Sequence, residues 1–296
     1  MKKAPVTVIM LTLNEEFHLP RAIENVKDWA DEIFIVDSCS TDRTVDIALE
    51  HSVNIVQRPF TNFGDQWNFA LEKLPIRSPW TFMLAPDERL TPELKAEISA
   101  TAYGNSNCSA YSVKWRLWFM GKPLHVWAPV LRLWRTGKCH ISNVIVNEHP
   151  IIEGPVGKLK AVLEHYDRPS LHEWFEKQNR YSTMEAIMRI TEAPLSTSPR
   201  LLGTVLERRM FFKKIFRHVP LRFQLLWIYN VLVRGAWLDG WRGLAWARLQ
   251  VEKERAIELK FVEMKTTGYI PEMAKTEDPR YDPRVLSSKL QELALK

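Results

Sequence analysis

The first third of the chain alternates short apolar runs with segments of helical length, and this alternation restricts the fold more than any other feature. Four runs rich in β-branched and apolar residues are predicted to be strands: Val6–Leu11, Ile33–Asp37, Val53–Gln57 and Trp80–Leu84. Strands that alternate with helices form parallel sheets through right-handed crossovers. The sequence therefore predicts an α/β fold with a mostly parallel, Rossmann-like sheet and helices on both faces.

Polar and acidic residues follow three of these runs at the point where each run ends. The clusters are Thr12–Glu15, Asp37–Asp42 and Asp87–Arg89. Open parallel sheets bind ligands beyond the carboxyl ends of their strands, so we predict a shared acidic site there. The chain has no G-x-G-x-x-G after its first strand and no G-K-[ST], which argues against dinucleotide binding and against a P-loop. Such carboxylates can hold a diphosphate through a divalent cation.

Helix-start signals organise the segments around these strands. One helix is expected after the second strand, with a cap within Ser40–Asp42. Thr91–Glu93 predicts another helix start, with proline at the first helical position. Ser170–Glu173 has the spacing of a capping box and predicts a helix that ends near Ile190. Between these helices, the alternating aromatic stretch over residues 111–150 is predicted to form strands and loops of a second layer.

The cysteines and the N-terminus favour a reducing cytoplasm. Cys39, Cys108 and Cys139 are odd in number and form no C-x-x-C pair, so we expect neither a disulfide framework nor a zinc site. Two lysines precede an apolar run near the N-terminus, but Pro5 interrupts it and no small-residue cleavage site follows. We expect a first strand there rather than a signal peptide.

A basic, aromatic segment occupies residues 200–248, where ten Lys and Arg residues stand against two acids. Helical spacing places Arg209, Lys213 and Arg217 on one stripe beside large apolar residues, a pattern typical of a helix at an anionic membrane interface. The alternative is a helix that packs on the catalytic domain with a solvated basic face. The apolar run at 223–233 is too short to span a bilayer. Nucleic-acid binding is less favoured, because no recognised binding motif is present.

Taken together, these motifs resemble the family 2 glycosyltransferases with the GT-A fold. The likeness rests on VTVIMLTLNEE, DEIFIVDSCSTDRTVDIA, FGDQWNFALE and the acidic strand end at 87–88. VNEHP, GPVGKLKAVLEHYDRPSLHEWFEKQNRYSTMEA and LDGWRGLAWA are similar to the bacterial lipopolysaccharide-core β-1,4-glucosyltransferase type. The resemblance covers residues 5 to 250 and implies an inverting, metal-dependent transfer of a sugar from a nucleotide donor.

The resemblance implies a role for individual residues. Asp87 would bind the Mg²⁺ or Mn²⁺ that bridges the diphosphate, and His165 would be a later ligand of the metal or the diphosphate. Glu148 would be the general base, and Arg132 would meet the charge of the leaving group. The nucleotide would contact residues from three motifs: Thr12, Asn14, Glu15, Asp37, Ser38, Asp42, Gln66 and Asn68.

The chain departs from the family pattern at two positions. The family usually has Asp-Ala-Asp-Glu where this chain has Ala-Pro-Asp-Glu, so Ala85 replaces the first carboxylate. It also usually has Lys or Arg at the position of Trp67. These departures imply weakened metal binding and an altered donor pocket. They leave open a non-catalytic saccharide-binding or scaffold protein as the alternative function.

Several of these residues also have a purely structural interpretation. Asp37 and Asp42 would then serve only as a turn and a helix cap. Glu148 would form an ion pair with His149, and His165 would be a hydrogen-bonded core histidine.

We predict three regions along the chain. A GT-A catalytic domain covers residues 1–192, with a nucleotide-sugar half at 1–100 and an acceptor half at 101–192. A basic amphipathic membrane-interface region covers 200–250, and a tail covers 251–296. The expected reaction moves a hexose, most simply from a UDP-sugar, to a lipid-linked or core saccharide in bacterial surface polysaccharide synthesis. The expected location is cytoplasmic, on the inner face of the cell membrane, with an anionic membrane surface as partner and no nucleic acid.

Overall fold

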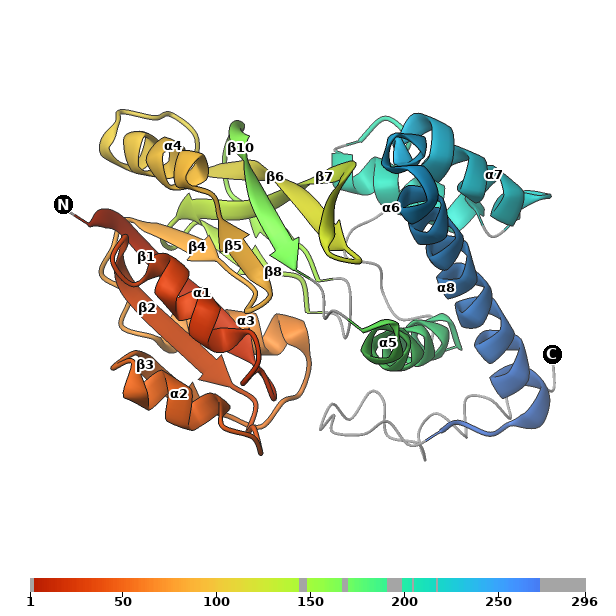
Figure 1. The fold of residues 1–296 in the computed structure, drawn as a ribbon, viewed down its shortest axis with the longest axis horizontal. Helices are drawn as coiled ribbons and strands as arrows, with labels where there is room; N and C mark the ends of the chain where they lie inside the picture. Colours follow the sequence, from red (N-terminus) through yellow and green to blue (C-terminus); the bar gives the residue numbers. More distant parts are fainter. Residues whose placement is uncertain are drawn as a thin grey trace. The chain divides into compact units, whose positions relative to one another are not determined.

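An eight-stranded sheet with the order β3-β2-β1-β4-β7-β6-β10-β5 is the frame of the N-terminal half of the chain (Figure 1). The computed structural model describes residues 3–143, 148–166, 170–190, 199–203, 205–216 and 218–271. The first of two units, which holds this sheet, consists of Met1–Phe60, Asp65–Ile141 and Pro150–Pro169. The second unit consists of Thr61–Gly64, Ser142–His149 and Ser170–Lys296.

The parallel half of the sheet confirms the four predicted strands. Its members are β1 (Ala4–Thr12), β2 (Ala30–Asp37), β3 (Asn54–Gln57) and β4 (Trp80–Met83). The helices that connect them are α1 (Leu19–Val26), α2 (Thr44–Glu50) and α3 (Phe63–Lys73). Alternate residues of β1 supply two cores: Val8 packs in the cluster that holds α1 and α2, and Ile9 packs in the cluster that holds Trp67 of α3. Helices therefore cover both faces of this half, as predicted.

The aromatic stretch forms strands of this same sheet, so the predicted second layer is wrong. Those strands are β6 (Ala110–Phe119) and β7 (Lys122–Arg135), which pair antiparallel with each other. β7 pairs antiparallel with β4, so that Phe82 lies opposite Leu133. The alternating pattern predicts strands, but it does not say which edge supplies their backbone partners. Here the free edge of β4 supplies them.

Two further strands complete the sheet at the edge opposite β3. β10 (Val156–Tyr166) runs parallel to β6, and β5 (Glu88–Leu90) pairs antiparallel with β10. A separate pair, β8 (Cys139–Ile141) and β9 (Pro150–Ile152), forms a small antiparallel sheet. β5 contains Glu88 and follows Asp87 directly, so the acidic pair stands where the chain turns from β4 into β5.

The predicted helix starts have different outcomes. Thr91 caps α4 (Pro92–Tyr103), accepting a hydrogen bond from Leu94 N at 3.2 Å, as predicted. The cap expected within Ser40–Asp42 is confirmed in part. Arg43 stands at the N-cap position of α2 without a side-chain hydrogen bond, but Asp42 Oδ1 accepts the amide of Thr44, the first residue of the helix, at 3.0 Å. The side chains of Ser40 and Asp42 also accept hydrogen bonds from backbone amides of the loop after β1.

The second unit is helical in its described part. It contains α5 (Leu171–Ile190), α6 (Val205–Phe216), α7 (Arg222–Ile228), the π-helical turn η1 (Tyr229–Val233), the 3₁₀ turn η2 (Ala236–Asp239) and α8 (Gly240–Thr267).

α5 begins after Ser170 and ends at Ile190, as predicted. It packs on α8 through a buried cluster that includes Ile187 and Met264, and Lys260 Nζ of α8 donates to Asn179 O of α5 at 2.7 Å. α8 runs across the boundary predicted between residues 250 and 251. None of the described helices is long and apolar enough to cross a bilayer.

Candidate active site

Asp37, at the end of β2, is buried and accepts four hydrogen bonds. Thr12 Oγ1 donates to its Oδ1 at 2.8 Å, because Thr12 and Asp37 are register partners of β1 and β2. Ser40 donates both its amide and its hydroxyl, and Gln57 Nε2 donates from β3 at 3.2 Å. A buried carboxylate requires such partners. Asp37 thus joins three strand ends, and its contact with the nucleotide stays a prediction.

The loops after β1 and β2 form one hydrogen-bonded rim. Asn14 has φ = 55° and Cys39 has φ = 60°, both in the left-handed region that non-glycine residues rarely adopt. The Asn14 side chain accepts the amide of Thr41 at 2.8 Å, and Glu15 N donates to Thr44 Oγ1 at 2.7 Å. Strained residues held by their surroundings cluster at ligand sites. Asn14 and Glu15 therefore lie on the rim where the sequence predicts the nucleotide, and their binding role stays a prediction.

Asp42 is the rim residue with a clear change in acidity. Partial burial acts to raise the pKa of its carboxyl, but hydrogen bonds from the Thr44 hydroxyl and from the amides of Glu16 and Thr44 outweigh that effect. The pKa of Asp42 therefore lies below its ordinary 3.8. The charged form of Asp42 stabilises the two loops.

We expect Asp42→Asn to destabilise the protein by about 1 kcal/mol at neutral pH, since hydrogen bonds to a charged group are lost at a partly exposed position. The folded pKa is below the unfolded pKa, so the carboxylate contributes fully above pH 3.8 and loses its contribution as the pH falls through the folded pKa. Urea unfolding of both proteins over this pH range measures the difference. A pH-independent difference would contradict the prediction, and Asp28→Asn at an exposed position is the control.

Polar side chains of α3 contact the loop after β2 and the strand β8. Gln66 is buried and donates from Nε2 to Ser38 Oγ at 3.1 Å, while Arg58 donates to its Oε1 at 2.8 Å. Asn68 exchanges two hydrogen bonds with the backbone of Ile141, at 2.8 and 2.9 Å, and so ties β8 to α3. Trp67 between them is buried in the core. These contacts are structural, and the nucleotide-binding roles of Ser38, Gln66 and Asn68 stay predictions.

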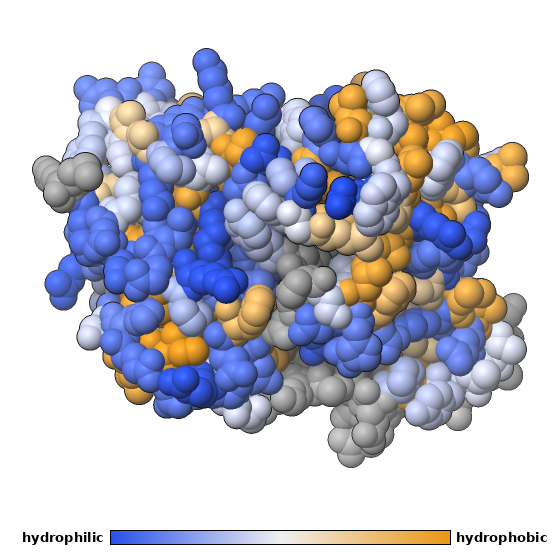
Figure 2. Space-filling model, viewed as in Figure 1, coloured by the Kyte–Doolittle hydropathy of each residue, from blue (hydrophilic) through white to orange (hydrophobic). Residues whose placement is uncertain are grey.

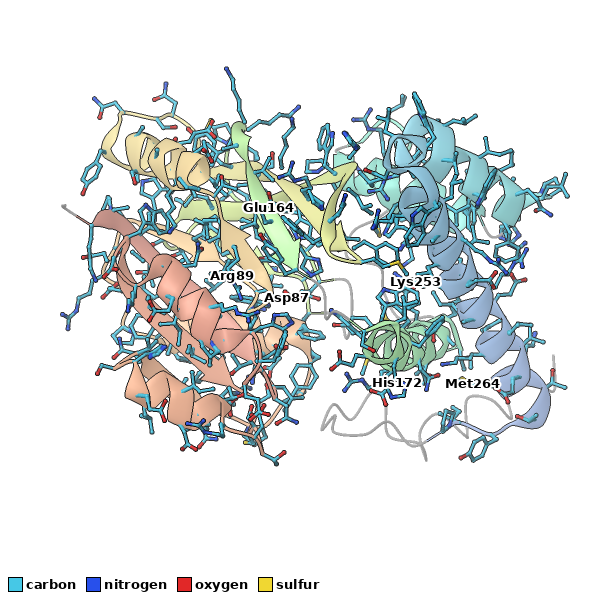
Figure 3. The ribbon with its side chains drawn as sticks, in the orientation of Figure 1. Asp87, Arg89, Glu164, His172, Lys253 and Met264 are labelled. Atoms are coloured by element: carbon cyan, nitrogen blue, oxygen red, sulfur yellow. The ribbon has the colours of Figure 1, made fainter. Side chains whose placement is uncertain are left out.

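The structure brings together the two residues predicted to bind a metal. Asp87 Oδ2 and His165 Nε2 lie 3.0 Å apart, and Tyr166 N donates to Asp87 O at 2.7 Å. Figure 3 shows Asp87 close to the carboxyl end of β10. The pairing of β10 with β5 produces this contact, since His165 stands opposite Glu88 in the register. Trp115 packs against the imidazole with ring centroids 4.4 Å apart and the rings tilted by 33°, which restricts the orientation of the imidazole.

The chemistry of this pair suits Mg²⁺ or Mn²⁺. A carboxylate oxygen and an imidazole nitrogen are both ligands of these ions. No cluster of three or more His, Cys, Asp or Glu side chains suited to a metal occurs in the part of the chain that the structure describes. Two protein ligands are enough for Mg²⁺, which completes its shell with water and substrate phosphate oxygens. The residues present therefore fit a cation that is held jointly by protein and substrate.

Glu88, beside this pair, is a buried carboxylate that accepts several hydrogen bonds, and its side chain is 1% exposed. Arg132 Nη2 donates to Glu88 Oε1 at 2.6 Å, and Trp115 Nε1 donates to the same oxygen at 2.8 Å. The other oxygen accepts the amide of Ala85 at 2.9 Å. Arg132 thus lies next to the metal candidates, as its predicted role requires, but Glu88 neutralises its charge. The sequence predicts only a supporting role for Glu88, as the second carboxylate of the acidic pair after β4, and its pairing with Arg132 was not predicted.

Arg89 is a second residue that was not among the predicted site residues. Its guanidinium donates to the carbonyl oxygens of Pro86, Glu88 and His18, at 2.6, 2.5 and 2.9 Å. Burial lowers the pKa of Arg89 to about 10, although the charge of Asp87 opposes this shift. Arg89 therefore fixes the turn that carries Asp87.

Glu164 precedes His165 in β10 but does not share its contacts. It pairs with Arg116 and accepts a hydrogen bond from Trp118 Nε1, since neighbouring strand residues face opposite sides of a sheet.

We expect Glu88→Gln to cost about 3 kcal/mol of folding free energy, because it leaves the half-buried Arg132 without its counter-charge. Glu88→Gln/Arg132→Met removes both charges, and we expect it to be more stable than the sum of the single changes. Urea unfolding of the four members of this double-mutant cycle measures the coupling. Strictly additive effects would show that the two side chains are not energetically coupled.

Glu148 belongs to the second unit, within Ser142–His149. This segment is closed by hydrogen bonds from Ser142 N to His149 O at 3.0 Å and from His149 N to Ser142 Oγ at 2.9 Å. Asn147 lies outside the described residues. The role of Glu148 as general base therefore stays a prediction.

A parallel β-α-β half with a carboxylate rim, extended by antiparallel strands, is the arrangement of the GT-A fold. Residues 7–138 match the family described as Glycosyl transferase family 2.

The chain is also similar to individual known proteins. The lipopolysaccharide core biosynthesis glycosyltransferase LpsC of Rhizobium meliloti is 28% identical over 268 residues, which cover 85% of this chain and 92% of LpsC. The mannosyltransferase PcManGT from Pyrobaculum calidifontis, solved with GDP-Man and Mn²⁺, has the same fold, with a TM-score of 0.53 at 13% identity and 88% of both chains covered. Glucosyl-3-phosphoglycerate synthase from Mycobacterium tuberculosis is matched over only 44% of its length and 38% of this chain, at 17% identity and a TM-score of 0.33.

Proposed function

We propose that this chain is an inverting glycosyltransferase that moves a hexose from a nucleotide sugar, most simply a UDP-sugar, to a lipid-linked or core saccharide. The observation that carries the proposal is the contact of Asp87 with His165 at the carboxyl edge of the parallel strands. The match of residues 7–138 to family 2 supports the class of reaction. The similarity to LpsC supports a place in bacterial surface polysaccharide synthesis.

In this proposal Asp87 and His165 hold Mg²⁺ or Mn²⁺. When bound, the cation neutralises charge on the departing diphosphate. Arg89 keeps the Asp87 turn in place, and Trp115 packs against the His165 ring and restricts its orientation. Arg132, paired with Glu88, adds a cationic group beside the leaving group. Asp37 and the rim of Asn14 and Glu15 face the nucleoside.

Glu148 is the proposed general base. It takes the proton of the acceptor hydroxyl as that oxygen attacks the anomeric carbon and the diphosphate leaves. One displacement at this carbon inverts its configuration, so the reaction needs no covalent enzyme intermediate. The acceptor half then has only to present a hydroxyl to this carboxylate.

We also propose that the chain works on the inner face of the cell membrane, where a lipid-linked acceptor is presented. The basic stripe expected on α6 gives limited support. The side chains of Arg209 and Arg217 lie outside the described residues, and Lys213 pairs with Glu185 at 3.0 Å. Lys213 is therefore engaged within the protein.

Calorimetric titration with UDP, with and without Mn²⁺, tests the proposed function. We expect Mn²⁺ to lower the dissociation constant of UDP by about tenfold or more, a change in binding free energy equivalent to one hydrogen bond between charged groups. GDP is the comparison nucleotide, and a panel of UDP-hexoses then identifies the donor by metal-dependent hydrolysis. Failure to bind any nucleotide with either metal would refute the proposal. Ala85, where the family usually has a carboxylate, would then favour the non-catalytic saccharide-binding or scaffold function.

A further inference from the structure

The second unit carries a run of exposed hydrophobic side chains over residues 221–244, called here the 221–244 surface. Its exposed members are Leu221, Leu225, Trp227, Ile228, Tyr229, Leu232, Val233, Trp237, Leu238, Trp241 and Leu244. They come from α7, η1, η2 and the first turns of α8. α7 contains no buried residue, although it is mostly apolar. In Figure 2 hydrophobic residues gather over the helices of this unit.

An exposed apolar surface of this kind marks an interaction site in a globular protein. The exposed fractions are large at its most apolar positions, with 72% for Val233 and 63% for Leu232. Two of its aromatic residues, Trp237 and Trp241, are 57% and 60% exposed. Trp and Tyr prefer the boundary between lipid and water, since one end of each ring is polar. Several exposed aromatic rings on one segment are therefore typical of a lipid-facing surface.

The charges on this segment point to the same partner. Residues 221–244 include Arg222, Arg234 and Arg242 against a single acid, Asp239. Arg222 pairs with Glu258 of α8, so its charge is balanced within the protein. The guanidinium of Arg242 lies over the Trp241 ring at 4.8 Å, and that of Arg234 lies over Trp246 at 5.0 Å. Two copies of this surface facing each other would bring the like charges of Arg234 and Arg242 together. Anionic lipid headgroups would attract them, so charge complementarity favours a membrane over a second copy of the chain.

The backbone suits a surface that lies in a membrane interface rather than one that crosses the bilayer. α7 has 7 residues, η1 has 5 and η2 has 4. α7 continues directly into η1, because Tyr229 keeps helical dihedrals, and this helix ends at Val233. Residues with positive φ then separate η2 from its neighbours, with φ = 78° at Gly235 and φ = 56° at Gly240. A spanning helix needs about 20 continuous apolar residues. The segment instead presents several short apolar faces, each able to bury side chains at the headgroup level.

We propose that the 221–244 surface seats the protein in the interface of an anionic phospholipid bilayer, with Trp237 and Trp241 as its aromatic anchors. The inference rests on the proposed association with the membrane, and it assigns that association to α7, η1, η2 and the start of α8 instead of α6. Arg234 and Arg242 accompany the anchors at the headgroup level. The protein is then held at the bilayer surface without a spanning helix.

Vesicle sedimentation of the full-length chain tests this assignment. The probes are phosphatidylglycerol–phosphatidylethanolamine vesicles, with phosphatidylcholine vesicles as the uncharged comparison. We expect the wild type to sediment with the anionic vesicles and less with the neutral ones. Trp237→Ser/Trp241→Ser should reduce partitioning on the order of 100-fold, because two large apolar side chains no longer enter the lipid.

Leu259→Ser/Val262→Ser is the matched control, since these α8 residues are 70% and 49% exposed but lie outside the 221–244 surface. It should bind vesicles like the wild type. If the tryptophan variant does not fold, as judged by circular dichroism, Leu232→Ser/Val233→Ser replaces it. UDP titration with Mn²⁺ on the same proteins should be unchanged, so a failure of membrane binding is distinguishable from a failure of the proposed function.

Three results would overturn the proposal. The first is a wild type that does not bind anionic vesicles, and the second is a control variant that loses as much binding as the tryptophan variant. The third is a wild type that does not bind vesicles but forms a dimer in sedimentation equilibrium, which Trp237→Ser/Trp241→Ser dissociates. That last outcome would identify a second copy of the chain as the occupant of the surface.

Discussion

Asp87→Ala is expected to lower the turnover of the nucleotide-sugar donor by at least about 10³-fold. Asp87 supplies the carboxylate of the proposed cation site, and Ala85 leaves no second aspartate in the motif to replace it. His165 alone would be a poor ligand for Mg²⁺, which prefers oxygen. The loss should therefore appear both in donor hydrolysis and in the Mn²⁺ enhancement of UDP binding.

The measurement is release of UDP from the UDP-hexose that the wild type hydrolyses, together with calorimetry of UDP and Mn²⁺. Asp31→Ala is the control, because it removes an exposed carboxylate at the start of β2, at the opposite end of that strand from the proposed site. It should retain both activities. Wild-type turnover and metal-enhanced UDP binding in Asp87→Ala would exclude Asp87 as the metal ligand.

Glu148→Gln is expected to lower kcat by about 10²–10⁴-fold while UDP binding in the presence of Mn²⁺ changes little. The amide keeps the shape of the side chain but cannot accept a proton at neutral pH. A general base acts on the attacking oxygen and not on the bound nucleotide, so the affinity for UDP should be independent of it. The split between rate and binding separates this role from a ligand role.

Release of UDP from the donor, with water as the acceptor, measures the rate, and calorimetry measures the binding. His149→Gln is the matched control at the neighbouring position, and we expect it to keep most of the rate. A wild-type rate in Glu148→Gln would rule out the base assignment. A parallel loss of UDP affinity would instead show that the change disturbs the donor site.

Much of the nucleotide half was predictable because its signals are local. The runs that form β1, β2, β3 and β4 are rich in β-branched and apolar residues, and their polar ends follow directly in the sequence. Parallel strands collect those ends at one edge, so Asp37 and Asp87 were correctly expected on the same edge of the sheet. The Thr91 cap and the extent of α5 were also predictable, since each depends on residues within one helical turn.

The errors concern pairing between distant segments. An alternating pattern identifies β6 and β7 as strands, but a strand does not carry the identity of its neighbour. The pairing of β7 with β4 therefore had no local signal, and a second layer was expected in its place. The bonds of Ser40 and Asp42 to the loop after β1 likewise had no local signal, because a cap pattern predicts only the contact of Asp42 with the start of α2.

The sequence by itself determined the α/β class, the acidic strand ends and the basic, aromatic character of the C-terminal part. Only the tertiary structure decided that Asp87 contacts His165, 78 residues away, and that Arg132 pairs with Glu88, 44 residues away. Both contacts depend on the register of β10 against β5 and on the placement of β7 beside β4. Side chains alternate between the faces of a strand, so a shift of one residue in β10 would turn His165 away and present Glu164 to Asp87. That register is set by hydrogen bonds between strands that are far apart in the chain, and for this reason short stretches of sequence do not encode it.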